Sequence, residues 1–86
     1  APVQVSELIP QIVEAVGGVD NISGVNACFT RLRLSLKDTA LVKDDSVFTK
    51  DLGASAIVHV DGGVQIVYGN KASVYKVEMR EYLGLE

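Results

Sequence analysis

The sequence predicts an α+β domain in which helices cover one face of an antiparallel sheet. Three features lead to this prediction: a strictly alternating strand over residues 31–37, two apolar runs flanking a turn at 61–63, and helical apolar spacing near both ends of the chain. Strands joined by tight hairpins pair antiparallel, and such a sheet can leave one face in water while helices cover the other. The 86 residues suffice for one such domain.

The first helix is expected just after the N-terminus, where Ser6 can cap a stretch with apolar residues at helical spacing. Those residues are Leu8, Ile9, Ile12, Val13 and Val16. Pro10 is awkward inside a helix that begins at Ser6, so the regular part is expected to begin closer to Pro10. The glycines at 17–18 end the helix. Residues 1–5 are interpreted as a linker, and residues 6–86 as the domain.

The central strand has the strongest signal in the chain. From Arg31 to Lys37 the residues alternate, with arginine, serine and lysine on one face and three leucines on the other. The leucines are Leu32, Leu34 and Leu36. A period of two with one apolar face predicts a half-buried strand.

The second half of the chain predicts a short helix, a hairpin and a final helix. The pair Asp44-Asp45 can cap a short helix that buries Phe48 and Leu52 and ends at Gly53. "SAIVHV" and "VQIVYG" flank Asp61-Gly62-Gly63, which is a turn signal for a hairpin. After Gly69 a helix is expected to run to about Leu83. The residues that this helix should bury are Ala72, Tyr75, Met79 and Tyr82.

The composition narrows the possible function classes. An apolar share of 48% favours a packed core over disorder. One cysteine forms no internal disulfide and one histidine completes no protein-only metal site, so we expect a reducing, cytosolic setting, with no metal and no cofactor. The net charge of −3 does not suggest nucleic-acid binding. No apolar run approaches the roughly 20 residues that span a bilayer, and no signal peptide is evident.

The segment "NACFTRLRLSLKD", residues 26–38, contains the only cysteine, Cys28, followed closely by two arginines. A strand continued backwards from Leu32 would bury Asn26 and Thr30 beside the thiol, at a desolvation cost. We therefore expect a turn over residues 26–29, which leaves the thiol at an exposed corner beside Arg31 and Arg33 of the polar strand face.

Two interpretations of Cys28 stay open on this evidence. A lone cysteine is most often a small buried apolar residue, and alternating arginines are usually a solvated face. The alternative is phosphoryl transfer through sulfur. An ordinary thiol has a pKa of about 8.5, and neighbouring guanidinium groups lower it and also match phosphoryl oxygens. Backbone N–H groups of the turn and the hydroxyl of Thr30 could hold the remaining oxygens.

Other thiol chemistries fit the sequence less well. A phosphatase of the Cys-x5-Arg type needs arginine at position 34, which is Leu34. A cysteine protease needs a histidine base, and His59 is the only histidine. A redox sensor would form sulfenic acid or mixed disulfides, but no second cysteine is present to resolve them.

The segment "NISGVNACFTRLRLSLKD", residues 21–38, resembles the cysteine-site signature of the EIIB domains of the glucose family of the sugar phosphotransferase system (PTS). The resemblance continues through "LGASAIV" at 52–58, "GVQIVYG" at 63–69 and the closing helix with "EMREYL". It implies a fold with a four-stranded antiparallel sheet and three helices on one face, which agrees with the pattern of the sequence.

The resemblance also implies a phosphotransferase activity with a phosphocysteine intermediate. Cys28 would accept a phosphoryl group from a phosphohistidine of EIIA and pass it to a sugar held by the membrane-embedded EIIC, possibly fused in the same polypeptide, at the cytoplasmic membrane face. Arg31, Arg33 and Thr30 would support the transferring group. The expected binding residues are Asn26, Phe29 and Gln65.

Two departures from the family pattern are visible. Asn26 stands where family members often carry an acidic residue. The absence of that negative charge should lower the pKa of the thiol. His59 stands where small apolar residues are common, and we interpret it as a solvent-facing strand residue. "GVQIVYG" weakly favours glucose or N-acetylglucosamine over sucrose and β-glucosides. A rival hypothesis is a regulatory module that keeps the fold and transfers nothing to sugar.

Overall fold

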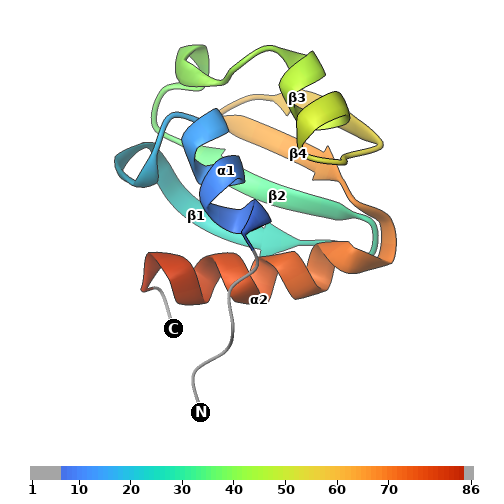
Figure 1. Ribbon diagram of the computed structural model, residues 1–86. Coiled ribbons are helices and arrows are strands. Elements are labelled where there is room, and N and C mark those ends of the chain that lie inside the picture. The colour runs from blue at the N-terminus through green and yellow to red at the C-terminus, as the bar shows by residue number, and fades with distance from the viewer. Residues whose placement is uncertain (1–6, 85–86) are drawn as a thin grey trace.

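The computed structural model describes residues 7–84, which form an antiparallel sheet of four strands with helices packed against it. In Figure 1 the first helix lies in front of the sheet and the last helix runs along its lower side. The spatial order of the strands is β1-β2-β4-β3, which confirms the expected α+β class. The strands are β1 Ile22–Ala27, β2 Arg31–Leu36, β3 Ala56–Val60 and β4 Gly63–Val67. The helices are α1 Leu8–Ala15 and α2 Ala72–Leu83, with short helical turns η1 Val19–Asn21, η2 Thr39–Leu41, η3 Val47–Asp51 and η4 Gly69–Lys71.

The register of the strands gives the sheet two different faces. Residues opposite each other in an antiparallel pair share a face. Leu34 of β2 lies opposite Val25 and Val64, and these residues form part of the face that the helices cover, which we call the buried face. The other side, the open face, carries a row across all four strands that consists of Asn26, Arg33, Gln65 and Val58.

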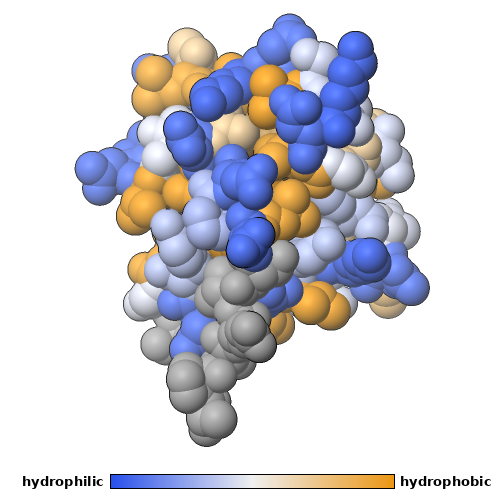
Figure 2. All heavy atoms as spheres, viewed as in Figure 1, coloured by the Kyte–Doolittle hydropathy of each residue, from blue (hydrophilic) through white to orange (hydrophobic). Residues whose placement is uncertain are grey.

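The core lies between the buried face and three helical segments, namely α1, α2 and the η3 turn. Its largest fully buried side chains are Phe48, Ile9, Ile12, Leu32, Ile66, Met79, Val16 and Val64. Burying one such side chain contributes roughly 1.5–3 kcal/mol before the entropy of folding is subtracted. On the side of the molecule seen in Figure 2, the apolar residues that reach the surface are separated by polar ones. Within residues 7–84, no helix is long and apolar enough to cross a membrane.

Helix α1 shows how the chain accommodates a proline. The helix begins at Leu8, two residues earlier than the regular start expected at Pro10. Pro10 is the third helical residue, and the first four N–H groups of a helix have no internal acceptor, so its missing donor costs no hydrogen bond. Beyond the helix, Gly18 adopts φ 96° and its N–H donates to the carbonyl of Val13 over 2.8 Å. The cap expected at Ser6 and the linker at 1–5 lie outside the described residues.

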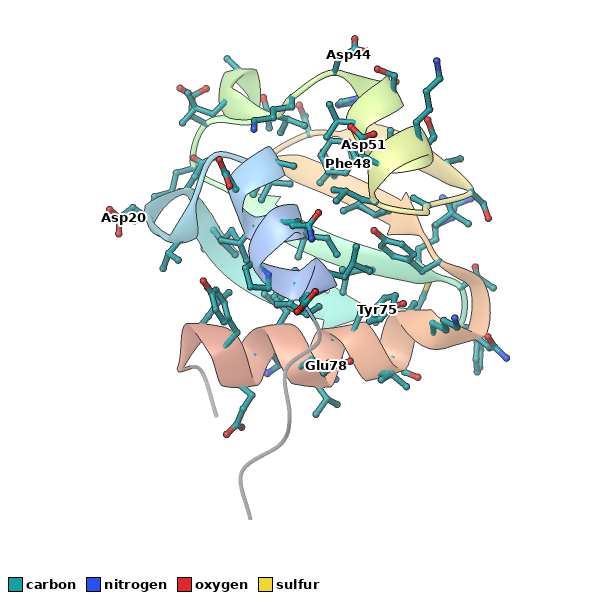
Figure 3. The ribbon with its side chains drawn as sticks, in the orientation of Figure 1. Asp20, Asp44, Phe48, Asp51, Tyr75 and Glu78 are labelled. Carbon is teal, nitrogen blue, oxygen red and sulfur yellow. The ribbon has the colours of Figure 1, made fainter. Side chains whose placement is uncertain are left out.

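The Asp44-Asp45 pair has two separate roles. Asp44 precedes the η3 segment, and its Oδ2 accepts from the hydroxyl of Ser46 over 2.6 Å and from the backbone N–H of Ser46 over 3.3 Å; both bonds lower the pKa of its carboxyl. Asp45 does not cap: its Oδ1 lies 2.6 Å from Nε2 of His59. Phe48 is fully buried beneath the segment, as the sequence predicts (Figure 3).

His59 is solvent-exposed as expected, but it lies on a different side of the sheet from the one that the alternation suggested. It pairs with Val64 and therefore belongs to the buried face, at the outer edge of strand β3. Its side chain stays about half exposed because β3 is an edge strand. Val58 and Val60 are the residues of β3 that lie on the open face.

Of the four residues that α2 was expected to bury, two are buried, one is half-buried and one is exposed. Ala72 and Met79 are fully buried, and Tyr75 is half-buried against the core. The prediction for Tyr82 is wrong, since this side chain is 43% exposed. The apolar stripe of a helix can continue three or four residues after Met79, at Tyr82 or at Leu83. Here Leu83 packs against the core. Glu78, labelled with Tyr75 in Figure 3, is buried as well.

The hairpin between β3 and β4 turns through two residues, Asp61 and Gly62. Gly63, which the sequence placed in the turn, is the first residue of β4 and lies opposite Ser35. A Cβ atom at Gly63 would overlap the carbonyl oxygen of Leu34 on the neighbouring strand. The backbones of β2 and β4 therefore approach each other closely at this point.

This close approach makes Gly63→Ala strongly destabilising. We expect it to lower the free energy of unfolding by about 3 kcal/mol, because backbone on both strands must move. The matched variant Gly53→Ala introduces a methyl group into open space at φ 72°, which should cost only about 1–2 kcal/mol of backbone strain. Urea unfolding of both variants measures the difference, and equal losses would contradict the assigned contact.

Candidate functional site

Cys28 begins a three-residue turn that joins β1 to β2. The turn covers residues 28–30, so the expected turn over 26–29 began two residues too early. Asn26 belongs to β1, where it lies opposite Arg33 on the open face and is exposed. The desolvation cost that argued against a strand at Asn26 therefore does not arise. The N–H of Cys28 donates to the carbonyl of Arg31 over 3.0 Å and closes the hairpin.

The turn is tied to the far end of strand β4 by a single carbonyl group. The oxygen of Thr30 accepts from the backbone N–H groups of both Tyr68 and Gly69, each over 3.0 Å. Gly69 has φ 66°, a left-handed conformation that glycine adopts without strain, and the chain passes from there into α2. The start of α2 is thereby held next to the cysteine.

Tyr68 is itself anchored. Its hydroxyl donates to the carbonyl of Leu52 over 3.0 Å, and its ring meets Tyr75 edge-on with centroids 4.9 Å apart. Burial of the hydroxyl raises the pKa of Tyr68 well above its usual range, so the phenol stays protonated and remains a donor. The backbone N–H that holds Thr30 is therefore carried by a well-packed residue.

The thiol of Cys28 lies at the surface and is not part of the core, so the interpretation as a buried filler is wrong. Its pKa is lowered, first of all by the backbone N–H of Thr30, and further by the N–H of Arg31 and by the charge and guanidinium of Arg33. Partial desolvation of the sulfur opposes this shift. The net lowering of the pKa raises the fraction of thiolate, which is the nucleophilic form of cysteine.

The two arginines differ in what they contact, which the sequence did not reveal. The guanidinium of Arg33 reaches the thiol. Arg31 instead donates from Nη1 to Oε1 of Gln65 over 2.9 Å. Both side chains lie on the open face, as expected for residues two apart on a strand.

A pocket of about 570 Å³ opens beside the sulfur. Its lining residues are Ala27, Cys28, Phe29, Asn70 and Ser73. Phe29 is 96% exposed, an unusual state for a large apolar side chain in the residue next to a nucleophile. Sequence reasoning missed Asn70 and Ser73, because polar residues near a helix start are ordinarily interpreted as caps. Elsewhere in residues 7–84, no group of three potential metal ligands comes together.

The contacts of the arginines predict different effects on the thiol. Arg33→Gln removes the positive charge that acts on Cys28, so the thiol pKa should rise and alkylation by iodoacetamide at neutral pH should slow severalfold. Arg31→Gln should change the rate little, because its guanidinium contacts Gln65. The measurement is the alkylation rate against pH, and equal midpoint shifts in both variants would contradict this division.

Asn26 offers a second test of the electrostatics. Asn26→Asp places a negative charge across the strand pair from Arg33, on the open face beside the thiol. A carboxylate there disfavours the thiolate and partly neutralises the guanidinium, so the alkylation profile should move to higher pH. An unchanged profile would show that residue 26 does not influence the thiol.

Comparisons with known proteins agree on one family. The family model described as "phosphotransferase system, EIIB" matches residues 10–42. The chain is 38% identical over 81 residues to the PTS system glucoside-specific EIICBA component of Staphylococcus carnosus, and equally to the glucose-specific EIICBA component of the same organism. These matches cover 94% of this chain but only 11% and 12% of the two relatives, so the chain spans a small part of their length.

The fold gives independent support. The crystal structure of one domain of the PTS system IIabc component from Clostridium difficile superposes with a TM-score of 0.75 and covers 91% of this chain and 80% of that one. The sequences are 24% identical, so this match speaks for the fold alone. Together with the matched signature around Cys28, the family model and the two relatives support the assignment of this chain as an EIIB domain of the glucose family of the phosphotransferase system.

Proposed function

We propose that this domain is a phosphocarrier in sugar uptake. Cys28 accepts a phosphoryl group from a phosphohistidine of EIIA and transfers it to a sugar bound by the membrane-embedded EIIC. The observation that carries the proposal is the thiol itself: it lies outside the core on a surface turn, and backbone N–H donors and Arg33 lower its pKa. The same features suit a nucleophile that must hold a phosphoryl group.

The first half-reaction forms an S–P bond and breaks an N–P bond. The thiolate of Cys28 attacks the phosphorus in line with the donor nitrogen. The electron pair of the N–P bond stays on the imidazole, which leaves as the neutral ring when its other nitrogen carries a proton. Arg33 and the N–H groups of the turn are placed to stabilise the charge on the phosphoryl oxygens during transfer.

The second half-reaction reverses the role of the sulfur. A sugar hydroxyl attacks the phosphorus, the S–P bond breaks, and its electron pair returns to Cys28 as the thiolate. The proton of the hydroxyl passes to a base of the sugar-binding partner or to water. The interactions that lower the pKa of the thiol also make it a better leaving group, so they serve this step as well.

The remaining site residues receive supporting roles. The Thr30 hydroxyl adds a donor for the phosphoryl group, and Arg31 adds a positive charge on the open face next to the site. Gln65 orients Arg31 through the hydrogen bond between their side chains. Phe29 and Asn26 flank the thiol on the turn and on β1, where they contact the docked partner.

The partners follow from the same assignment. The relatives are named EIICBA components, a name that combines EIIC, EIIB and EIIA in one protein. We propose that this domain also works with an EIIC and an EIIA. It would occupy residues 6–86, preceded by a linker at 1–5, and act at the cytoplasmic face of the membrane. Sugar selectivity resides in EIIC, since the site on this domain handles only phosphate.

Phosphoryl acceptance can be tested by intact mass. After incubation with phosphoenolpyruvate, the general phosphotransferase proteins and a glucose-type EIIA, the chain should gain one phosphoryl adduct. Cys28→Ser removes the thiolate and should abolish the adduct, because a serine hydroxyl at this position is not ionised near neutral pH. An adduct that persists in the variant would assign the acceptor elsewhere.

Two further outcomes separate the proposal from its rival. Loss of the adduct when EIIC and its sugar are added shows delivery to sugar. An adduct that forms but is never delivered by any glucose-family EIIC would favour the regulatory module.

A further inference from the structure

Polar groups from two parts of the chain come together at the pocket beside Cys28. Arg33 and the N–H groups of the turn act on the thiol itself. Asn70 and Ser73, from the start of α2, line the same cavity as Cys28. The proposed function uses only the first group.

The position of Asn70 and Ser73 relative to the sulfur is fixed by the backbone. Thr30, two residues after the cysteine, holds the N–H of Gly69, the residue directly before Asn70. Asn70 lies in the η4 turn and Ser73 is the second residue of α2, so both occupy a short, regular segment. The pocket is therefore lined by two segments that one carbonyl group joins.

Both side chains are free to bind a ligand. Within residues 7–84, neither the amide of Asn70 nor the hydroxyl of Ser73 has a hydrogen-bond partner, although both are exposed at the pocket wall. An amide and a hydroxyl together supply three N–H or O–H donors. Phe29 and Ala27 form the apolar part of the same wall.

We propose that Asn70 and Ser73 are positioning residues that donate hydrogen bonds to the phosphoryl group on Cys28. This inference rests on the proposed function and names the second half of that site. A phosphoryl group bonded to sulfur has three outward oxygens, and Arg33 with the turn can serve those on the strand side. The oxygens that face the pocket meet Asn70 and Ser73 and no cation among the lining residues.

The chemistry of these donors gives the proposal a distinctive signature. Neutral donors that touch only the phosphoryl oxygens stabilise the phosphorylated state and leave the free thiol unchanged. Arg33, by contrast, acts on both states through its charge. Loss of an Asn70 or Ser73 bond should therefore change phosphoryl occupancy without changing the pKa of Cys28.

The test compares Asn70→Ala and Ser73→Ala with the unaltered chain. At equilibrium with phosphorylated EIIA, the ratio of phosphorylated to free domain, measured by intact mass, should fall about tenfold for each variant, as expected for one lost hydrogen bond to a charged group. Ser73→Thr retains the hydroxyl and should restore most of the ratio. The pH profile of Cys28 alkylation should remain that of the unaltered chain.

Two matched controls exclude trivial causes. Ser23→Ala removes an exposed hydroxyl at the far end of β1 and should leave the ratio unchanged. Lys71→Gln removes a positive charge that lies between the two residues in sequence but does not line the pocket, and it should change the ratio less than twofold. Unfolding of Ser73→Ala is not expected, because alanine is the better helix former.

The outcomes are distinguishable. If the unaltered chain forms no phosphocysteine, the proposed function and this inference both fail. If it forms one and the alanine variants change the ratio less than twofold, only this inference fails. It also fails if the alanine variants shift the pH profile of Cys28 alkylation as Arg33→Gln does, because they would then act on the thiol. It fails as well if Lys71→Gln changes the ratio more than they do, because the effect would then come from positive charge near the site.

Discussion

The geometry of the site depends on one carbonyl group, that of Thr30. This oxygen receives two backbone N–H groups, from Tyr68 and Gly69, and so joins a turn near one third of the chain to a segment near its end. Without it, the turn that carries Cys28 would be held only by the closing bond of its own hairpin. With it, strands β2 and β4 bring the turn of Cys28 and the segment of Asn70 to one pocket. A carbonyl that accepts two backbone hydrogen bonds is a strong constraint, since each lost bond leaves a donor to be solvated.

The same alternation that builds the core also exposes the chemistry. Leu34 is buried between neighbouring strands, and Arg33, one residue earlier, must therefore lie on the open face beside the thiol. The other end of this hairpin is held by Asn21, whose side chain donates to the carbonyls of Val16 and Asp38 over 2.7 and 2.9 Å and accepts from the N–H of Asp38. Asn21 opens the cysteine signature, but its contacts are architectural: it connects the end of α1 to the end of β2. The signature thus contains the nucleophile together with the bonds that hold both ends of its hairpin.

Features with a local signal could be predicted from the sequence, and features set by register or by distant segments could not. The alternating leucines identify β2, and a single cysteine followed by basic residues identifies the site. The turn was misplaced because the face of Asn26 depends on how β1 pairs with β2, which the sequence of one strand does not contain. Tyr82 was misplaced because a helical stripe can continue in either of two ways. The bond between Arg31 and Gln65, and the arrival of Asn70 at the pocket, join residues more than thirty positions apart and become visible only in the folded chain.

A phosphocarrier faces opposing demands on its thiol. A lower pKa raises the fraction of thiolate and makes the sulfur a better leaving group, but it also lowers the intrinsic nucleophilicity of that thiolate. Cys28 therefore gains from a lowering that comes mainly from backbone N–H groups and from a single guanidinium, that of Arg33, while Arg31 is engaged elsewhere. Neutral donors such as Asn70 and Ser73 avoid the conflict, because they can hold the phosphoryl oxygens without acting on the sulfur. In the proposed phosphocarrier, some groups would adjust the pKa of the thiol and others would hold the phosphoryl group, which would allow both transfer steps to proceed at one site.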